Sequence, residues 1–137
     1  MGYRFVDEVP TVEQHRALAV AVGWEGSFRW EAMGASLAGS VCGVVALGTD
    51  DQAVAMGRVV GDGSFYFYLQ DIAVHPDHRR QGLGREVLRR LLAQVEERAG
   101  GDCFVGLFST PEAVELYRGA GFGTETMTGM WQVLRPR

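Results

Sequence analysis

Apolar and polar positions change period along the first half of the chain, and each change marks an expected element. The segment 11–14 (TVEQ) is a capping box that opens a first helix, which Gly23 ends. Residues 24–39 mix aromatic and small residues and indicate a short second helix or an ordered loop. Residues 40–47 and 53–60 are apolar and rich in β-branched side chains, and a polar turn between them predicts a hairpin.

The second half begins with the longest expected strand, residues 65–74, which a His-Pro-Asp sequence ends. Apolar residues then recur every three or four positions over 83–99, which predicts an amphipathic helix. The short apolar run 103–108 is typical of a strand buried on both faces. A further helix is expected after Thr110 and the proline that follows it, and residues 123–135 indicate one more hairpin.

This order of elements predicts an α/β fold with a mixed sheet. The strand, helix and strand of residues 65–108 form a crossover, which places two parallel strands inside an otherwise antiparallel sheet. Helices should then cover both faces of the sheet. Since no repeat or linker divides the sequence, we expect residues 1–137 to form a single domain.

Composition narrows the classes of partner. Hydrophobic residues make up 47% of the chain and charged residues 22%, as in ordinary globular proteins. A net charge of −4 argues against nucleic acid, and no apolar run is long enough to suggest a membrane partner or a leader. Cys42 and Cys103 lie in apolar runs without metal-site spacing, so we expect buried free thiols, no metal and a cytoplasmic protein.

Positive charge and glycine gather at the junction of the expected strand and helix, in the sequence RRQGLG at 79–84. Backbone N–H groups at a helix start are unpaired, and Gly82 and Gly84 let a phosphate approach them without meeting a Cβ atom. Arg79 and Arg80 add charge and forked donors, so a pyrophosphate is the expected guest. A dinucleotide fingerprint is excluded because Val87 occupies the third glycine position, and no P-loop sequence is present.

These residues resemble a known family. The sequence RRQGLG after IAVHP, followed by REVLRRLLAQVEERA, is similar to the signature of the GNAT superfamily of acetyl-CoA-dependent N-acetyltransferases. The segment PEAVELYRGAGF is similar to the family's next helix, and GRVVGDG before the long strand resembles bacterial members. The resemblance is specific over residues 71–122 and weak before residue 40.

The resemblance implies acetyl-CoA as cosubstrate and a role for each matching position. Backbone and side-chain groups of the loop would contact the coenzyme A pyrophosphate, and the parallel strand pair would flank the acetyl-CoA site. Tyr117 would protonate the departing thiolate, and Thr110 stands where many relatives have asparagine. The strand segment 72–74 would pair with the pantetheine arm, and one of its backbone N–H groups would hold the thioester oxygen. The cofactor contacts that the resemblance implies in the loop and strand are Gln81, Gly82, Leu83, Gly84, Arg85, Ile72, Ala73 and Val74.

The general base has more than one candidate. Asp71 is the carboxylate of the long strand, and it could take the proton of the amine or serve a structural role beside an arginine. Tyr68 and Gln70 are expected on the opposite face of the strand, where they could relay the proton through water. The spacing of Tyr117 alone favours a core aromatic residue, whereas the resemblance favours an acid.

Aromatic residues between the first two helices suggest where an acceptor could bind. Trp24 and Phe28 could pack on the core or form a wall for a cationic amine. We therefore expect direct acetyl transfer to a small primary amine. Acetylation of a protein lysine or N-terminus, and a non-catalytic coenzyme A-binding regulator, are the alternatives. A homodimer is left open.

Overall fold

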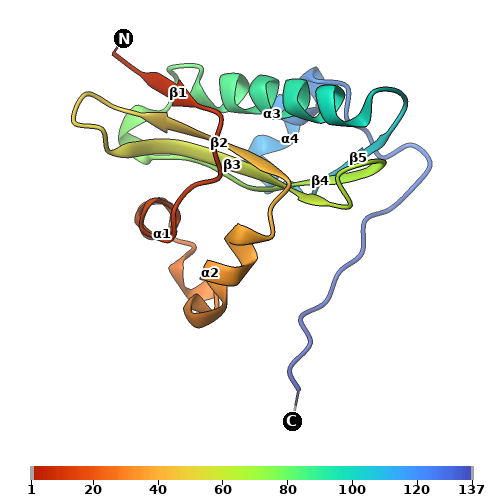
Figure 1. The fold of residues 1–137 in the computed structure, drawn as a ribbon, viewed down its shortest axis with the longest axis horizontal. Coiled ribbons are helices and arrows are strands. Elements are labelled where there is room, and N and C mark those ends of the chain that lie inside the picture. The colour runs from red at the N-terminus through yellow and green to blue at the C-terminus, as the bar shows by residue number, and fades with distance from the viewer. Residues whose placement is uncertain (1, 137) are drawn as a thin grey trace. The chain divides into compact units, whose positions relative to one another are not determined.

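The computed structural model describes residues 2–136, which divide into two compact units. The first unit extends to Leu107 and contains the sheet with the helices that cover it, drawn from red to blue-green in Figure 1. The second unit begins at Phe108 and contains one short helix. Each unit is described by itself below.

The first unit is built on a five-stranded sheet in which sequence order is also spatial order. The first four strands pair antiparallel, and the last two pair parallel through residues 66–68 and 104–106. The mixed sheet predicted from the crossover is therefore present. Its strands are β1 (Arg4–Val6), β2 (Cys42–Leu47), β3 (Ala53–Gly61), β4 (Tyr66–Val74) and β5 (Phe104–Gly106).

Helices lie on both faces of this sheet, as Figure 1 shows. Helices α1 (Val12–Ala21) and α2 (Trp30–Ala38) lie on one face, and α3 (Leu83–Ala99) runs along the other. The capping box at Thr11 is present, because its hydroxyl accepts from the Gln14 N–H and the Gln14 side chain accepts from the Thr11 N–H. The first helix therefore begins where the sequence predicts.

Each face of the sheet has its own apolar layer. On the α1 side, Leu18 packs with Met56 and Ala73, and all three side chains are buried. On the α3 side, the helix approaches β3 at Gly57, where an added Cβ would lie 2.8 Å from Leu91 Cδ1. Glycine is required at that position because a larger residue would push α3 away from the sheet.

Three sequence-based expectations for the sheet and the tail differ from the structure. Strand β1 was not predicted, because three residues are too few to show an alternating pattern. Strand β5 is half-buried along its length and not buried on both faces. The predicted hairpin at 123–135 is wrong: these residues form neither helix nor strand. A two-stranded hairpin is marginally stable by itself, and Gly123 and Gly129 weaken its strands further.

The second unit contains a short 3-10 turn (Pro111–Ala113) followed by helix α4 (Val114–Gly119). The proline at the start of this segment supports the predicted helix start after Thr110. The helix ends with the N–H groups of Ala120 and Phe122 donating to the Tyr117 carbonyl. The ring of Phe122 also meets the Tyr117 ring edge-on at 6.1 Å between centroids.

Replacing Gly57 with alanine should destabilise the protein, because the new Cβ would lie within 3.0 Å of Leu91, Val87 and Ile72. We expect a loss of about 1–3 kcal/mol in the free energy of unfolding, measured by urea denaturation. The matched control is Gly34→Ala in α2, where an added Cβ meets no atom within 4 Å. That change should stabilise by about 0.5–1 kcal/mol, and equal effects of the two substitutions would contradict the close approach of α3.

Candidate functional site

Strand β4 contains a bulge at its centre. Ala73 pairs with Met56 and Gln70 pairs with Arg58, so Asp71 and Ile72 together face the single residue between those partners on β3. Asp71 has a φ of 58°, in the left-handed region that residues with a Cβ rarely adopt. The strand therefore changes direction at the one carboxylate that the sequence singled out.

The side chain of Asp71 is held by two buried partners. Arg58 Nε donates to Asp71 Oδ2 at 2.9 Å, and His15 Nε2 lies 2.9 Å from the same oxygen. The Asp71 side chain is 12% exposed, against 8% for Arg58 and 0% for His15. Burial by itself raises the pKa of Asp71, but the hydrogen bonds from His15 and Arg58 and the charge of Arg58 outweigh it and lower the pKa. Asp71 is therefore a stable carboxylate.

Arg58 extends this network to the second helix. Its Nη1 donates to the Ser36 carbonyl and to Ser40 Oγ, both at 3.1 Å, and its Nη2 donates to Ser36 Oγ at 3.3 Å. These acceptors lie at the C-terminal end of α2 and just after it. One guanidinium thus connects β3, β4 and the end of α2.

His15 connects the same carboxylate to α1. Because a carboxylate only accepts, His15 Nε2 carries the proton of this hydrogen bond. The ring is packed edge-on against Phe28 at 4.9 Å and Trp30 at 5.7 Å between centroids. Its Nδ1 is buried and has no hydrogen-bond partner within residues 2–136. The bond to Asp71 is therefore the polar contact that fixes this imidazole.

The bulge also changes the expected faces of β4. Residues opposite each other in an antiparallel pair share a face, so Gln70 projects from the same face as Arg58. Since Arg58 binds Asp71, the Asp71 carboxylate lies on that face too, and Tyr68 joins it two residues before Gln70. The sequence placed Tyr68 and Gln70 opposite Asp71, and that expectation is wrong because simple alternation fails at a bulge.

One edge of β4 is open to pairing beyond Tyr68. The parallel partner β5 pairs only with residues 66–68, and no other strand of the described chain pairs with this edge. His75 N–H donates to the Val54 carbonyl on β3, so alternation directs the N–H and C=O groups of Val74 and Ile72 to the open side. These groups can hold an extended ligand as an added strand would be held.

The loop 79–84 leads directly into α3 and leaves its first N–H groups unpaired. Gly82 has a φ of 77° and Arg80 a φ of 65°, and no side chain caps the helix. The first intrahelical bond is donated by Glu86 N–H to the Gly82 carbonyl, so the N–H groups of the three residues between them have no acceptor in the helix. A Cβ at Gly82 would meet no atom within 4 Å. This helix start is suited to an anion.

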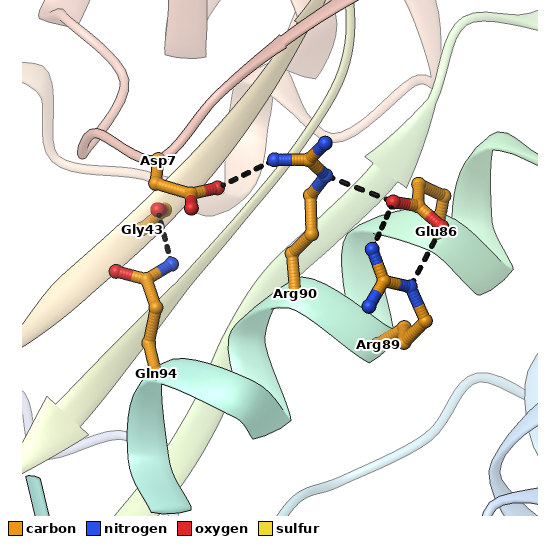
Figure 2. Close-up of polar contacts among 6 residues, drawn as sticks. All are labelled: Asp7, Gly43, Glu86, Arg89, Arg90 and Gln94. Carbon is orange, nitrogen blue, oxygen red and sulfur yellow. Dashed lines mark hydrogen bonds and ion pairs between the residues drawn. The ribbon is translucent and has the colours of Figure 1, made fainter. Parts of the chain in front are cut away.

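The arginines around this loop fall into two groups. Figure 2 shows that the Glu86 carboxylate accepts from both Arg89 and Arg90, and that Arg90 also donates to Asp7. The distance from Arg90 Nη1 to Asp7 Oδ1 is 3.2 Å. Hydrogen bonds and charge from these two arginines lower the pKa of Glu86 to about 2. By contrast, no ion pair within residues 2–136 involves the exposed Arg79, Arg80 and Arg85, so these three remain available to an anion.

The aromatic residues proposed for acceptor binding lie in two places. Trp24 packs against the apolar layer of Leu18, Met56 and Ala73, which supports the core-packing alternative for this residue. Phe28 instead lies over His15, beside Trp30 at 5.3 Å between ring centroids. Phe28 therefore contacts the network at Asp71 through the His15 ring.

In the second unit, Tyr117 is 8% exposed, and burial raises the pKa of its hydroxyl. A raised pKa keeps the phenol protonated at neutral pH, as a proton donor requires. Thr110 precedes the 3-10 turn, and its side chain caps no N–H group there. Both residues belong to the same short segment of chain.

Sequence reasoning missed His15, Arg58 and the role of Glu86. Glu86 could have been found, because acid and base three and four residues apart on a helix form ion pairs. His15 is on the apolar stripe of α1, but nothing in the sequence pairs it with a residue 56 positions away. His75 follows β4 as the cap of a 3-10 turn, where its Nδ1 accepts from the Asp77 N–H. No cluster of metal ligands occurs in the part of the chain that the structure describes.

Comparison with known proteins identifies the family. Residues 7–122 match the model of the acetyltransferase (GNAT) family. The chain belongs to this family. Among solved structures, a probable acetyltransferase of unknown function from methicillin-resistant Staphylococcus aureus has a TM-score of 0.85 at 26% identity, over 97% of this chain and 99% of the other. This GNAT chain therefore shares its fold with a bacterial relative along nearly its whole length.

Two further relatives have names that state a substrate. Serotonin N-acetyltransferase 2 from rice is 38% identical over 53% of this GNAT chain and 35% of its own length. The alanine N-acetyltransferase of ribosomal protein bS18 from Escherichia coli is 37% identical over 55% of this chain and 49% of its own length. The chain thus spans about a third to a half of these relatives. No helix in residues 2–136 is long and apolar enough to cross a membrane.

Proposed function

We propose that this chain transfers an acetyl group from acetyl-CoA directly to a primary amine. The observation that carries the proposal is the arrangement in the first unit. An uncapped helix start, beside three arginines without an ion pair in residues 2–136, follows a strand with an open edge, and residues 75–82 lie between the two. A pyrophosphate fits the first feature and an extended arm fits the second. Coenzyme A has both parts, and GNAT proteins use acetyl-CoA.

Each part of the cosubstrate has residues suited to hold it. The N–H groups at the start of α3, with Gln81 in the loop, would bind the pyrophosphate, and Arg79, Arg80 and Arg85 would add charge. The open edge of β4 from Ile72 to Val74 would bind the pantetheine arm. Glycine at 82 supports this assignment because the space beside its backbone is open.

Acetyl-CoA supplies an activated thioester, and the chain supplies the groups that direct its transfer. A fixed N–H on the β4 edge would stabilise the negative charge that develops on the thioester oxygen. Tyr117, kept protonated by burial, would donate a proton to the departing thiolate. Burial also raises the pKa of the Cys42 thiol, which makes it a poor nucleophile and favours direct transfer over an acyl-enzyme.

The amine must lose a proton before it attacks. Asp71 was the sequence candidate for this base, but its low pKa and two hydrogen-bonded partners make it a weak one. Tyr68 and Gln70 lie on the same face of β4 and could hold a water that takes the proton. We therefore favour the water route over direct transfer to Asp71.

We infer that the acceptor is a small amine with an aromatic or apolar body. Phe28 and Trp30 offer aromatic surface beside the Asp71 network, and the net charge of −4 favours a cationic substrate. The names of the relatives do not choose between substrates, since one acts on serotonin and another on a protein alanine. A protein acceptor and a non-catalytic regulator are the alternatives. A cytoplasmic location and a homodimer stay predictions.

Coenzyme A binding should depend on Gly82. Gly82→Glu would place a negative side chain where the pyrophosphate is proposed, and we expect binding measured by calorimetry to fall at least about 100-fold, as for a desolvated like-charge contact. Gly100→Glu is the matched control, because Gly100 has a φ of 67° against 77° for Gly82 and also has no atom within 4 Å of an added Cβ. Equal binding by the two variants would refute the placement.

Tyr117→Phe tests the proton donor. We expect kcat to fall by about 10- to 1000-fold, in the lower part of the range for loss of a positioned acid, with coenzyme A binding nearly unchanged. The measurement is steady-state release of coenzyme A thiol with a saturating amine. Wild-type turnover by the phenylalanine variant would return Tyr117 to a packing role.

The choice of acceptor can be measured directly. In a competition at equal concentration, small aromatic amines should give a higher kcat/KM than polyamines, aminoglycosides, or peptides with free lysine or N-terminal amines. The assay also separates catalysis from regulation, because a non-catalytic binding protein would release no thiol with any amine. A peptide preferred by about tenfold, a difference of 1.4 kcal/mol in transition-state binding, would show a protein acceptor.

A further inference from the structure

The proposed chemistry assigns no role to the buried hydrogen-bonded network of His15, Asp71 and Arg58. We propose that Asp71 is a positioning residue: held by His15 and Arg58, it fixes the bulge of β4 and so the direction of the backbone N–H groups that serve acetyl transfer. This inference rests on the proposed function. It assigns to the carboxylate a role in the reaction other than accepting a proton.

The first support is the backbone conformation of Asp71. A residue with a Cβ is strained in the left-handed region, and only asparagine and aspartate adopt it readily besides glycine. Asp71 is one of three non-glycine residues with positive φ in the described chain, and the other two, Asp51 and Arg80, lie in an exposed turn and loop. Within a strand of the sheet, such a conformation persists only where surrounding contacts fix it.

The second support is the position of those contacts. Both hydrogen bonds converge on one atom, Asp71 Oδ2, from α1 on one side and β3 on the other. Arg58 is itself fixed by three bonds to the end of α2 and to Ser40. The partners are buried and have little freedom, so they hold the carboxylate, and with it the backbone of residue 71, in one place.

The unpaired Nδ1 of His15 points to the same role. Buried polar atoms are usually satisfied, and leaving one without a partner costs stability. The His15 ring packs edge-on against Phe28 and Trp30, and its Nδ1 has no partner in residues 2–136, while Nε2 binds Asp71. A leucine would fill this apolar position without that cost, so the bond to Asp71 accounts for a histidine there.

The bulge connects this network to the reacting edge. It places the Asp71 side chain on the sheet face that α1 and α2 cover. The next residue, Ile72, points to the α3 face, because its Cγ1 lies 3.0 Å from where a Cβ on Gly57 would be. The alternation of N–H groups along the open edge is reset at this point. A flattened strand would shift the N–H groups of Ile72 and Val74 from the thioester to β3.

The experiment compares three substitutions of Asp71. Asparagine keeps an oxygen for both bonds and tolerates positive φ; glycine keeps only the backbone conformation; alanine keeps neither. We expect kcat in the order wild type, Asp71→Asn, Asp71→Gly, Asp71→Ala. The asparagine variant should stay within about tenfold of wild type, well short of the loss of a general base. The kcat of Asp71→Ala should be at least about fivefold below that of Asp71→Gly, because a residue with a Cβ is strained in the left-handed region whereas glycine is not. The KM for the amine should change little.

If Asp71 were the base, all three variants would lose about 10²- to 10⁴-fold alike. If the bulge did not depend on Asp71, all three would retain wild-type kcat. Either result overturns the inference while leaving acetyl transfer intact. A wild-type protein that acetylates no amine would instead refute the proposed function, and this inference with it.

Removal of the carboxylate leaves Arg58 buried without its partner, and the glycine and alanine variants could fail to fold. Thermal denaturation checks this, and a second pair then decides. His15→Gln can donate from its amide in place of Nε2, whereas His15→Leu fills the site without a donor. We expect the glutamine variant to have the higher kcat, and equal kcat in the pair would contradict the positioning role.

Discussion

The first unit depends on the pair of hydrogen bonds that the Asp71 carboxylate accepts from His15 and Arg58. This carboxylate receives a hydrogen bond from α1 and one from β3, and through Arg58 it is joined to the end of α2. Removing one member of such a buried charge network typically lowers the free energy of unfolding by about 3–5 kcal/mol, so these elements depend on one another for stability. The same carboxylate lies at the bulge of β4, directly before the open edge at residues 72–74, so folding and the candidate site share one group.

A second carboxylate, that of Glu86, separates the arginines near the start of α3 into a group with ion pairs and a group with none in residues 2–136. Glu86 forms ion pairs with Arg89 and Arg90 along α3, and Asp7 also pairs with Arg90. The remaining arginines of the cluster, Arg79, Arg80 and Arg85, are exposed beside unpaired helix N–H groups. Positive charge on this net acidic chain is thus concentrated at one helix start, which suits a small anion better than an extended polyanion.

Local features of the chain could be predicted from its sequence. The capping box at Thr11, the helix after Gly82 and the parallel pairing of β4 with β5 follow from spacing and connection rules. The bulge at Asp71 could not, because no local pattern marks it and the partners of Asp71 lie 13 and 56 positions away. Tyr68 and Gln70 were placed on the wrong face for the same reason. Sequence patterns carry local geometry, whereas the site is made by contacts between distant segments.

Titration of the labelled protein with coenzyme A, followed by backbone amide NMR, tests the central claim most directly. We predict that the largest shifts occur at the start of α3, in Leu83, Gly84 and Arg85, and along the open edge of β4 at Ile72 and Val74. Shifts confined to other parts of the chain, or shifts at the helix start with none along β4, would contradict a single site formed by the loop and the open strand edge.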